Sequence, residues 1–184
     1  MNIAEVNDKS SAEEFLSLPR RLYKNDPNFI SPLDKDIEAV FDPKLNNFHS
    51  HGIIKRWIAK NGNGEPIGRI AAFINNKKNK NPDFIIGGIG FFESVNDEKV
   101  AFSLLDTAKH WLQQNNAKAM DGPVNFGEND KYWGLLIEGF VPPSMGMNYN
   151  PPYYKDFFER YGFEKLYDQF TNVIHTEKGF PERV

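Results

Sequence analysis

PPYYKDFFERYGFEK, residues 151–165, brings together a helix start, an aromatic helical face and a helix stop. Pro151 and Pro152 suit the first helical turn, because their φ angles are already near helical values and no backbone N–H is needed there. The aromatic residues that follow recur at spacings of three and four and so share one helical face: Tyr154, Phe157, Phe158 and Tyr161. Gly162 is typical of a left-handed helix cap, and the apolar residues from Phe163 onward predict a strand. A core helix packed on a sheet is the simpler interpretation of this segment, and a catalytic role is the alternative.

The composition predicts one cytoplasmic domain that spans residues 1–184. The chain has 184 residues, of which 40% are hydrophobic and 14% aromatic, enough for a complete core. It has no cysteine, which excludes disulfides, thiol nucleophiles and thiolate metal sites. No run approaches the roughly 20 apolar residues that span a bilayer, and the polar N-terminus does not resemble a secretion signal. The net charge of −3 argues against nucleic acid, because phosphate binding needs a basic surface. We therefore expect neither a nucleic-acid nor a membrane partner.

Helices and strands are predicted along the whole segment before residue 125. Ser11 and Glu14 resemble a capping box at the start of the first helix, which Pro19 interrupts or kinks. Asn61-Gly62-Asn63-Gly64 predicts a hairpin turn, since these residues accept positive φ angles. The other predicted elements are a helix over 33–40, strands over 53–59, 67–74 and 84–92, a helix over 97–114 and a strand over 117–124.

Three glycines, Gly87, Gly88 and Gly90, lie inside the strand predicted over 84–92. They indicate either a bulge, where another molecule approaches the backbone closely, or tight packing against the sheet. A long aromatic loop is predicted over residues 125–150, and loops of this length in compact domains are usually functional.

Polar residues cluster at the start of this loop: Asn125, Glu128, Asn129 and Asp130. They could bind or deprotonate an amine, although the same residue types are what ordinary turns prefer. His49 and His51 have the spacing of two metal ligands. No third ligand lies near them in sequence, so we expect a solvated pair and no metal.

The predicted order helix, helix, strand, strand, strand, long helix, strand, helix, strand resembles that of the GNAT N-acyltransferase superfamily over residues 12–174. GEPIGRIAAFI, residues 64–74, resembles the family's second and third strands, and FFERYGFEK, residues 157–165, resembles its closing phrase F-Y-x-x-x-G-F. With GRIAAFINNKKN, GFFE, GENDKYWGLL and YNPPYY, the chain also resembles the N-terminal part of longer bacterial GNAT-like proteins. The resemblance implies an α/β (α+β) fold with a mixed, mostly antiparallel sheet and helices on both faces.

This resemblance also implies a function: acyl transfer from CoA or a carrier thioester to an amine, with acyl-CoA as cosubstrate. It places the acyl-CoA where the strands over 84–92 and 117–124 diverge, with the thioester hydrogen-bonded to the backbone of the first strand. The residues implied for this contact are Gly88, Gly90, Phe91, Phe92, Asn96 and Asn125. For the chemistry, Glu128 or Asp130 is the candidate base and Tyr154 the candidate acid.

Two departures from the family pattern favour a catalytically silent module that binds a small molecule or supports a partner domain. In the family, the loop after the strand that corresponds to residues 84–92 carries glycines whose N–H groups bind the CoA pyrophosphate, whereas residues 93–98 contain three acids and no glycine. The family commonly has a tyrosine four residues before the turn glycine, where its phenol protonates the leaving thiolate. Phe158 holds that position here, and Tyr154, one turn earlier, is the candidate replacement.

The C-terminal end predicts an exposed sheet edge. Family members finish with a further strand, but only the short, proline-broken HTEKGFPERV follows Ile174. Either another chain supplies the last strand or the sequence is part of a longer protein. In both cases we expect the free edge to favour a homodimer or a partner domain.

Overall fold

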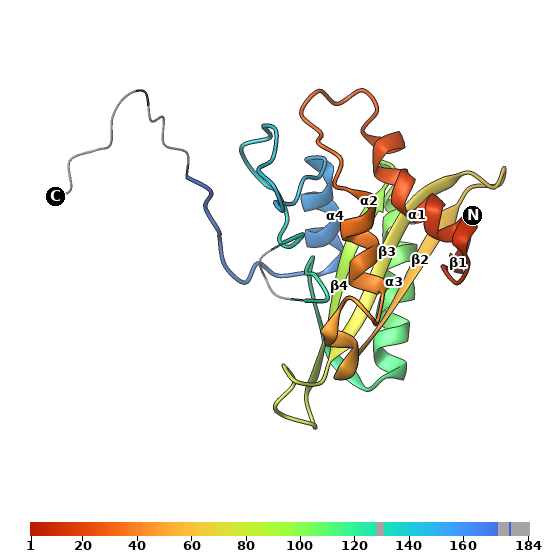
Figure 1. The fold of residues 1–184 in the computed structure, drawn as a ribbon, viewed down its shortest axis with the longest axis vertical. Coiled ribbons are helices and arrows are strands. Elements are labelled where there is room, and N and C mark those ends of the chain that lie inside the picture. The colour runs from red at the N-terminus through yellow and green to blue at the C-terminus, as the bar shows by residue number, and fades with distance from the viewer. Residues whose placement is uncertain (128–130, 173–176, 178–184) are drawn as a thin grey trace.

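The computed structural model describes residues 1–127, 131–172 and 177 and contains one five-stranded sheet in the order β1-β2-β3-β4-β5 (Figure 1). The elements are β1 (Asn2–Glu5), α1 (Lys9–Leu22), α2 (Asp34–Phe41), η1 (Asn47–Ser50), β2 (Gly52–Lys60), β3 (Pro66–Asn75), β4 (Ile85–Ser94), α3 (Glu98–Gln114), β5 (Ala117–Asp121) and α4 (Tyr153–Tyr161). β1 to β4 pair antiparallel, and α3 crosses over so that β5 pairs parallel to β4. The predicted α/β class with a mostly antiparallel sheet is confirmed.

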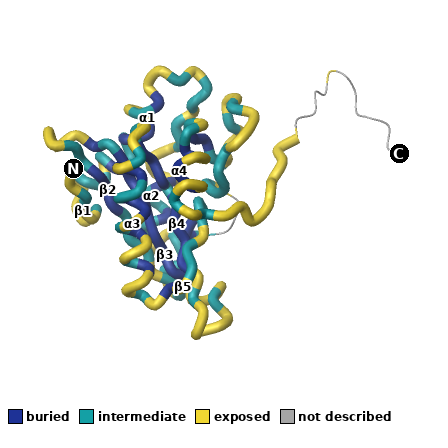
Figure 2. Tube along the Cα trace, turned by 180° about the vertical axis from the view of Figure 1, so that it is seen from behind, coloured by how far each residue is buried: buried dark blue, intermediate teal, exposed yellow. Residues whose placement is uncertain are grey.

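The core lies on both faces of the sheet, as the strand alternation requires. On one face, Ile70 and Ala72 of β3 pack in a cluster with α3 and α4. On the opposite face, Phe73 packs with Val40 of α2 and with Phe126, which follows β5. Buried residues are accordingly concentrated along β3 and β4 (Figure 2). None of the described helices is long and apolar enough to cross a membrane.

Helix α1 differs from its prediction at both its start and its proline. It begins at Lys9, because Asp8 and Ser11 form the capping box, and the expected box at Ser11 and Glu14 is wrong. Pro19 lies inside the helix rather than interrupting it. Because proline has no N–H, the carbonyl oxygen of Phe15, four residues before Pro19, lacks its helical donor. Nη1 of Arg69 donates to this oxygen instead, at 2.6 Å. A strand residue thus supplies the hydrogen bond that allows the helix to continue.

Two strand predictions need correction. The N-terminal residues of the chain form β1, which pairs with β2 and was not expected from their polar sequence. Residues 163–172 form no strand, and nearly all of them are exposed; the expected strand residues 173 and 174 lie outside the described part of the chain. The physical reason is that strand residues need a partner ladder, and β5 offers only five residues at the edge of the sheet.

Candidate functional site

The candidate site lies where β4 and β5 diverge. β4 pairs with β5 up to Gly88 opposite Asp121, after which the chain leaves the ladder at Gly122 and returns only at Val124, whose N–H donates to the Ile89 oxygen at 2.7 Å. Residues 90–94 of β4 therefore have no neighbouring strand on the β5 side within the described residues.

β4 also bulges at this point. Arg69 of β3 pairs with Glu93 and Ala71 with Gly90, so β4 carries one extra residue, and Phe91 has a φ angle of 51°. Such a bulge turns the strand and re-aims the side chains that follow it. The predicted bulge thus comes directly after the glycines rather than at them.

The glycines of β4 are required by packing. A Cβ on Gly90 would lie 2.0 Å from the Val124 carbonyl oxygen, and a Cβ on Gly88 would lie 2.2 Å from the Phe73 ring. Tight packing, one of the two interpretations of these glycines, therefore accounts for the positions of both Gly88 and Gly90. Close approach by a CoA thioester stays a proposal.

Helix α4 meets β4 through its tyrosines. The Ser94 N–H donates to the Tyr154 hydroxyl at 2.6 Å, and the Tyr153 hydroxyl donates to the Ser94 carbonyl at 2.9 Å. Gly162 ends the helix with a φ of 106°, as predicted. Phe158, at the position where the family commonly has its acid, packs edge-on against Phe92 and has no polar role. The backbone groups at the end of β4 are therefore already satisfied by α4.

A buried polar cluster stands at the end of β4 and consists of Arg69, Glu93, Tyr23 and Tyr154. Tyr154 is only 1% exposed and donates its hydroxyl hydrogen to Oε2 of Glu93 at 2.9 Å. Tyr23, the C-cap residue of α1, donates to the same oxygen, while Arg69 lies 3.5 Å from Oε1. One carboxylate thus joins α1, β3, β4 and α4.

Burial dominates the electrostatics of this cluster. Desolvation raises the pKa of Glu93 above its usual range, and the attraction of the Arg69 guanidinium opposes that rise. Burial and the neighbouring Glu93 charge together raise the pKa of the Tyr154 phenol well above 10, so the phenol keeps its proton at neutral pH. The Nε–H of Arg69 has no hydrogen-bond partner although it is buried. An unpaired donor in such a place is unusual, and it is available to a bound water or a ligand.

A small pocket of about 60 Å³ opens onto this cluster. Its inner wall includes Arg69, Glu93 and Tyr154. The remaining wall comes from α1, α2, the bulge, the segment after β5 and two loops, residues 24–33 and 132–150, and includes Phe91, Phe92, Pro123, Tyr132, Leu135, Met147 and Asn150. The pocket therefore has the buried ionisable cluster in one wall, and the rest of its wall is largely apolar but also includes Asn148 and Asn150.

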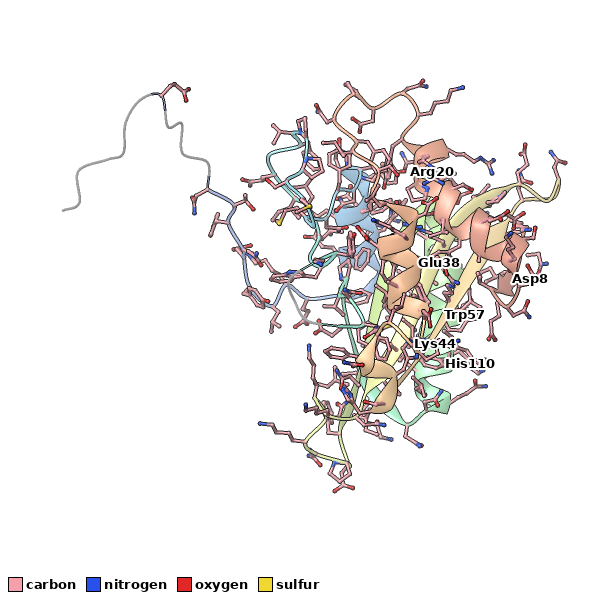
Figure 3. The ribbon with its side chains drawn as sticks, viewed as in Figure 1. Asp8, Arg20, Glu38, Lys44, Trp57 and His110 are labelled. Carbon is pink, nitrogen blue, oxygen red and sulfur yellow. The ribbon has the colours of Figure 1, made fainter. Side chains whose placement is uncertain are left out.

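A larger, open depression of about 570 Å³ is lined by the start of α1 and by Glu38 of α2, and Figure 3 labels Asp8 and Glu38. Its polar groups are already engaged. Asp8 caps α1, and Glu38 forms an ion pair with Arg56 at 2.7 Å. The depression therefore offers less chemistry than the smaller pocket.

The structure places the predicted site residues unevenly. Tyr154, Phe91 and Phe92 line the pocket. Asn125 is buried just after β5, and its Oδ1 has no hydrogen-bond partner, whereas Asn96 is exposed in the loop before α3. The candidate bases Glu128 and Asp130 lie outside the described residues.

Glu93 lies in β4 and not in the loop that the sequence predicted for it. The predicted acidic loop over residues 93–98 is in fact shorter, because Glu93 and Ser94 are buried in β4. Only Asp97 and Glu98 lie at the start of α3, where Asp97 caps the Lys99 N–H at 2.8 Å. The signal that could have identified the cluster is a charged residue in each of two apolar strands, Arg69 and Glu93, because such residues are rarely buried unless paired.

His49 and His51 have protein partners. His49 Nε2 lies 3.2 Å from the Val40 oxygen, and His51 Nδ1 lies 3.1 Å from Oδ1 of Asn75. Both rings therefore help to hold the segment before β2.

The chain is similar to two curated bacterial proteins, and no protein-family model matches it. It is 32% identical over 162 residues to Protein YghO of Escherichia coli strain K12. The matched region covers 88% of this chain and 41% of that protein. It is 29% identical over 184 residues to the bacterial ceramide synthase of Caulobacter vibrioides. This match covers 99% of this chain and 47% of that protein. The chain thus spans somewhat less than half the length of these relatives.

Several solved acetyltransferases have a similar fold. The ribosomal-protein-alanine N-acetyltransferase of Brucella melitensis superposes with a TM-score of 0.54 at 11% identity, covering 95% of this chain and 100% of that one. A predicted acetyltransferase of Clostridium acetobutylicum, solved with acetyl-CoA, gives 0.52 at 16% identity and covers 94% and 95%. Together with the β4 bulge and the divergence of β4 from β5, these similarities identify the fold of this chain as that of the GNAT N-acyltransferases.

Proposed function

We propose that this chain transfers an acyl group from a CoA or carrier thioester to an amine. The observation that carries the proposal is the hydrogen-bonded pair of Glu93 and Tyr154 at the base of a pocket beside the β4–β5 divergence. The fold supports the same reaction class, since structural neighbours include acetyltransferases solved with acetyl-CoA or CoA. Fold alone does not fix function, so the proposal rests on the pair.

The pair can move the one proton that the reaction transfers. An amine must lose a proton as its nitrogen forms the C–N bond, and the sulfur must gain one as the C–S bond breaks. In the proposed sequence Glu93 accepts the amine proton, Tyr154 gives its phenolic proton to the thiolate, and Glu93 returns a proton to Tyr154. Glu128 and Asp130, beyond the described residues, stay alternative bases in this proposal.

The relative from Caulobacter vibrioides agrees with this reaction class. Its name describes a ceramide synthase, and ceramides are amides of long-chain amino alcohols. The bond proposed here is the same N-acyl bond. In this proposal the thioester lies along β4, near Gly88, Gly90, Phe91 and Phe92, while Asn125 offers its unpaired Oδ1 to the ligand and Asn96 faces the CoA nucleotide.

A catalytically silent module is the second candidate, and three observations favour it. The pocket has only about 60 Å³ of space, and Tyr153 and Tyr154 already bind the Ser94 backbone. The start of α3 carries Asp97 and Glu98, whose charges oppose a pyrophosphate there. In this role the chain would bind a small molecule or support a partner domain, in a homodimer or a longer protein, through the edge of the sheet beyond β5.

Titration of acetyl-CoA and a long-chain acyl-CoA by calorimetry, followed by a thiol-release assay with a panel of amines, separates the two candidates. Acyl transfer predicts heat of binding and amine-dependent thiol release. In that case Tyr154→Phe lowers turnover and keeps thioester binding, while the control Tyr161→Phe, which changes a surface tyrosine bonded to Asp106, changes neither. Binding without turnover would indicate the silent module, and no heat or thermal shift at millimolar ligand would refute acyl transfer by this chain alone.

A further inference from the structure

Arg69 brings an unpaired hydrogen-bond donor to the wall of the pocket. Its Nη1 donates to the Phe15 oxygen at 2.6 Å, and its Nη2 lies 3.5 Å from Oε1 of Glu93, which is longer than an ordinary hydrogen bond. Its Nε–H has no partner among the described residues, although Arg69 is only 6% exposed. Because arginine carries donors and no acceptor, a ligand group that completes this site must bring an acceptor atom.

Other buried polar side chains of the pocket wall already have partners. Asn150 accepts from the Leu136 N–H at 2.8 Å and donates to the Leu136 oxygen at 3.1 Å. The Tyr149 hydroxyl donates to Asp26 at 2.7 Å. Of the buried side-chain atoms that lack a partner in the described part of the chain, only Nε of Arg69 belongs to a residue of the pocket wall. The open donor is therefore specific to Arg69.

The charges of the pocket wall are already balanced. Arg69 and Glu93 are the charged residues that line the pocket within the described ranges, and they form an ion pair. A cationic group that entered the pocket would face the guanidinium, and an anionic group would face the carboxylate. A third charge in this buried place would have no counterion, which is costly. The balance favours an uncharged ligand group.

The size and lining of the pocket restrict that group further. Pro19 of α1 and Ile37 of α2 place the pocket on the face of the sheet that these two helices cover (Figure 1). Its volume of about 60 Å³ accommodates a few water-sized groups. A carbonyl group suits such a space, because one donor can satisfy its oxygen while its substituents contact apolar side chains such as Phe91 and Phe92.

We propose that the pocket is a subsite for an uncharged carbonyl group, whose oxygen accepts the Nε–H of Arg69. The inference rests on the proposed function, in which this group is the carbonyl of the acyl thioester, and it adds the residue that binds the reacting oxygen. When the amine nitrogen bonds to the carbonyl carbon, the C=O electron pair moves onto the oxygen, where the positive Arg69 stabilises it. The pair returns as the C–S bond breaks and its electrons leave with the sulfur.

The test uses three small molecules of nearly the same shape and different charge: acetamide, acetate and acetamidinium. The arginine Nε–H signals of the intact protein are recorded by nitrogen-15 NMR, and the Arg69 signal is assigned through its own side-chain carbons. We expect acetamide to shift the Arg69 signal with saturation in the millimolar range, and the two ions to shift it far less. A stronger effect of acetate or acetamidinium would indicate a charged ligand and overturn the proposal. A signal that no probe moves would leave water as its only partner and overturn it as well.

A variant pair assigns the affinity to Arg69. Arg69→Lys keeps the positive charge and removes the Nε–H, so the dissociation constant of acetamide, followed on the backbone amides of Phe91 and Phe92, should rise about tenfold or more. The matched control is Arg56→Lys. The Arg56 guanidinium also lies over the Phe15 ring, at 5.2 Å, and is ion-paired, but Arg56 does not line this pocket. Equal losses in the two variants would refute the role of Arg69, and if Arg69→Lys does not fold, the three probes on the wild type decide.

Methyl thioacetate tests whether the carbonyl is that of the thioester. It carries the same acetyl group as acetamide and should shift the same Arg69 signal; a signal that acetamide moves and the thioester does not would overturn the assignment. None of these measurements needs turnover. A wild type that binds both probes at Arg69 and transfers no acyl group would therefore refute the proposed function alone. Amine-dependent thiol release by a wild type whose Arg69 signal no carbonyl probe moves would refute this inference alone.

Discussion

Replacing Tyr154 with phenylalanine removes one oxygen from the buried polar cluster and leaves the ring contacts in place. The ring still packs edge-on against Phe92, so the change isolates the hydroxyl. Glu93 loses a donor at 2.9 Å, and a hydrogen bond to a charged group contributes about 1.5–3 kcal/mol. The Ser94 N–H loses its acceptor at 2.6 Å, and a buried unpaired donor costs about 1–3 kcal/mol. We expect the free energy of unfolding to fall by about 3–5 kcal/mol.

This loss can be measured by urea unfolding followed by circular dichroism and by thermal melting. For a chain of this size the melting temperature changes by roughly 2–4 °C per kcal/mol, so Tyr154→Phe should lower it by about 10 °C. The matched control is Tyr161→Phe, which loses an exposed hydrogen bond to Asp106 at 2.7 Å and should change stability by no more than about 1 kcal/mol. If both variants lost the same small amount, the hydroxyl of Tyr154 would not be part of a buried network, and the reasoning would fail.

Three other predictions follow from the same contacts. Gly90→Ala should lower the free energy of unfolding by about 2 kcal/mol or more, because the new Cβ would lie 2.0 Å from the Val124 carbonyl oxygen. Gly62→Ala, whose Cβ would have no atom within 4 Å, should be nearly neutral, and urea unfolding compares the two variants. Because the folded-state pKa of Glu93 is raised, the contribution of Glu93 to stability is complete below about pH 4.5 and is lost as pH rises through that folded pKa. Unfolding curves from acid to neutral pH should therefore show the stability of the wild type declining relative to Glu93→Gln, and a constant difference between the two would contradict this prediction. Burial and the hydrogen bond to Asp26 raise the pKa of Tyr149 to about 12, so the contribution of Tyr149 to stability is complete below about pH 10 and is lost as pH rises through 12. Compared with the wild type, Tyr149→Phe should lack one late-ionising tyrosine in an ultraviolet titration.

The elements of this fold could largely be predicted from local patterns. Gly162 ends α4 as expected, because a left-handed cap depends on a single residue and its immediate neighbours. The hairpin of β2 and β3 was also expected, since its turn residues are a local signal. α1 shows where local patterns are insufficient. Its continuation past Pro19 depends on a hydrogen bond from Arg69, 54 positions away from Phe15.

The candidate site was predicted only in part. The sequence predicts Tyr154 as the substitute for the acid that is missing one turn later, and Tyr154 lines the pocket. Glu93 was interpreted as a loop acid because the bulge that extends β4 past it depends on its register with β3, which the sequence does not display. Nothing in the segment around Tyr23 predicts its partner 70 positions away.

The sequence by itself determined the α/β class, the order of most elements and the aromatic helix α4, because periodicity, turn residues and helix caps act over a few neighbouring positions. Only the tertiary structure decided that Arg69, Glu93, Tyr23 and Tyr154 share one buried cluster at the base of a pocket. The register of β3 with β4 and the approach of α1 and α4 bring these groups together. Their pKa values depend on burial and on charges from distant segments, and both exist only once the chain has folded.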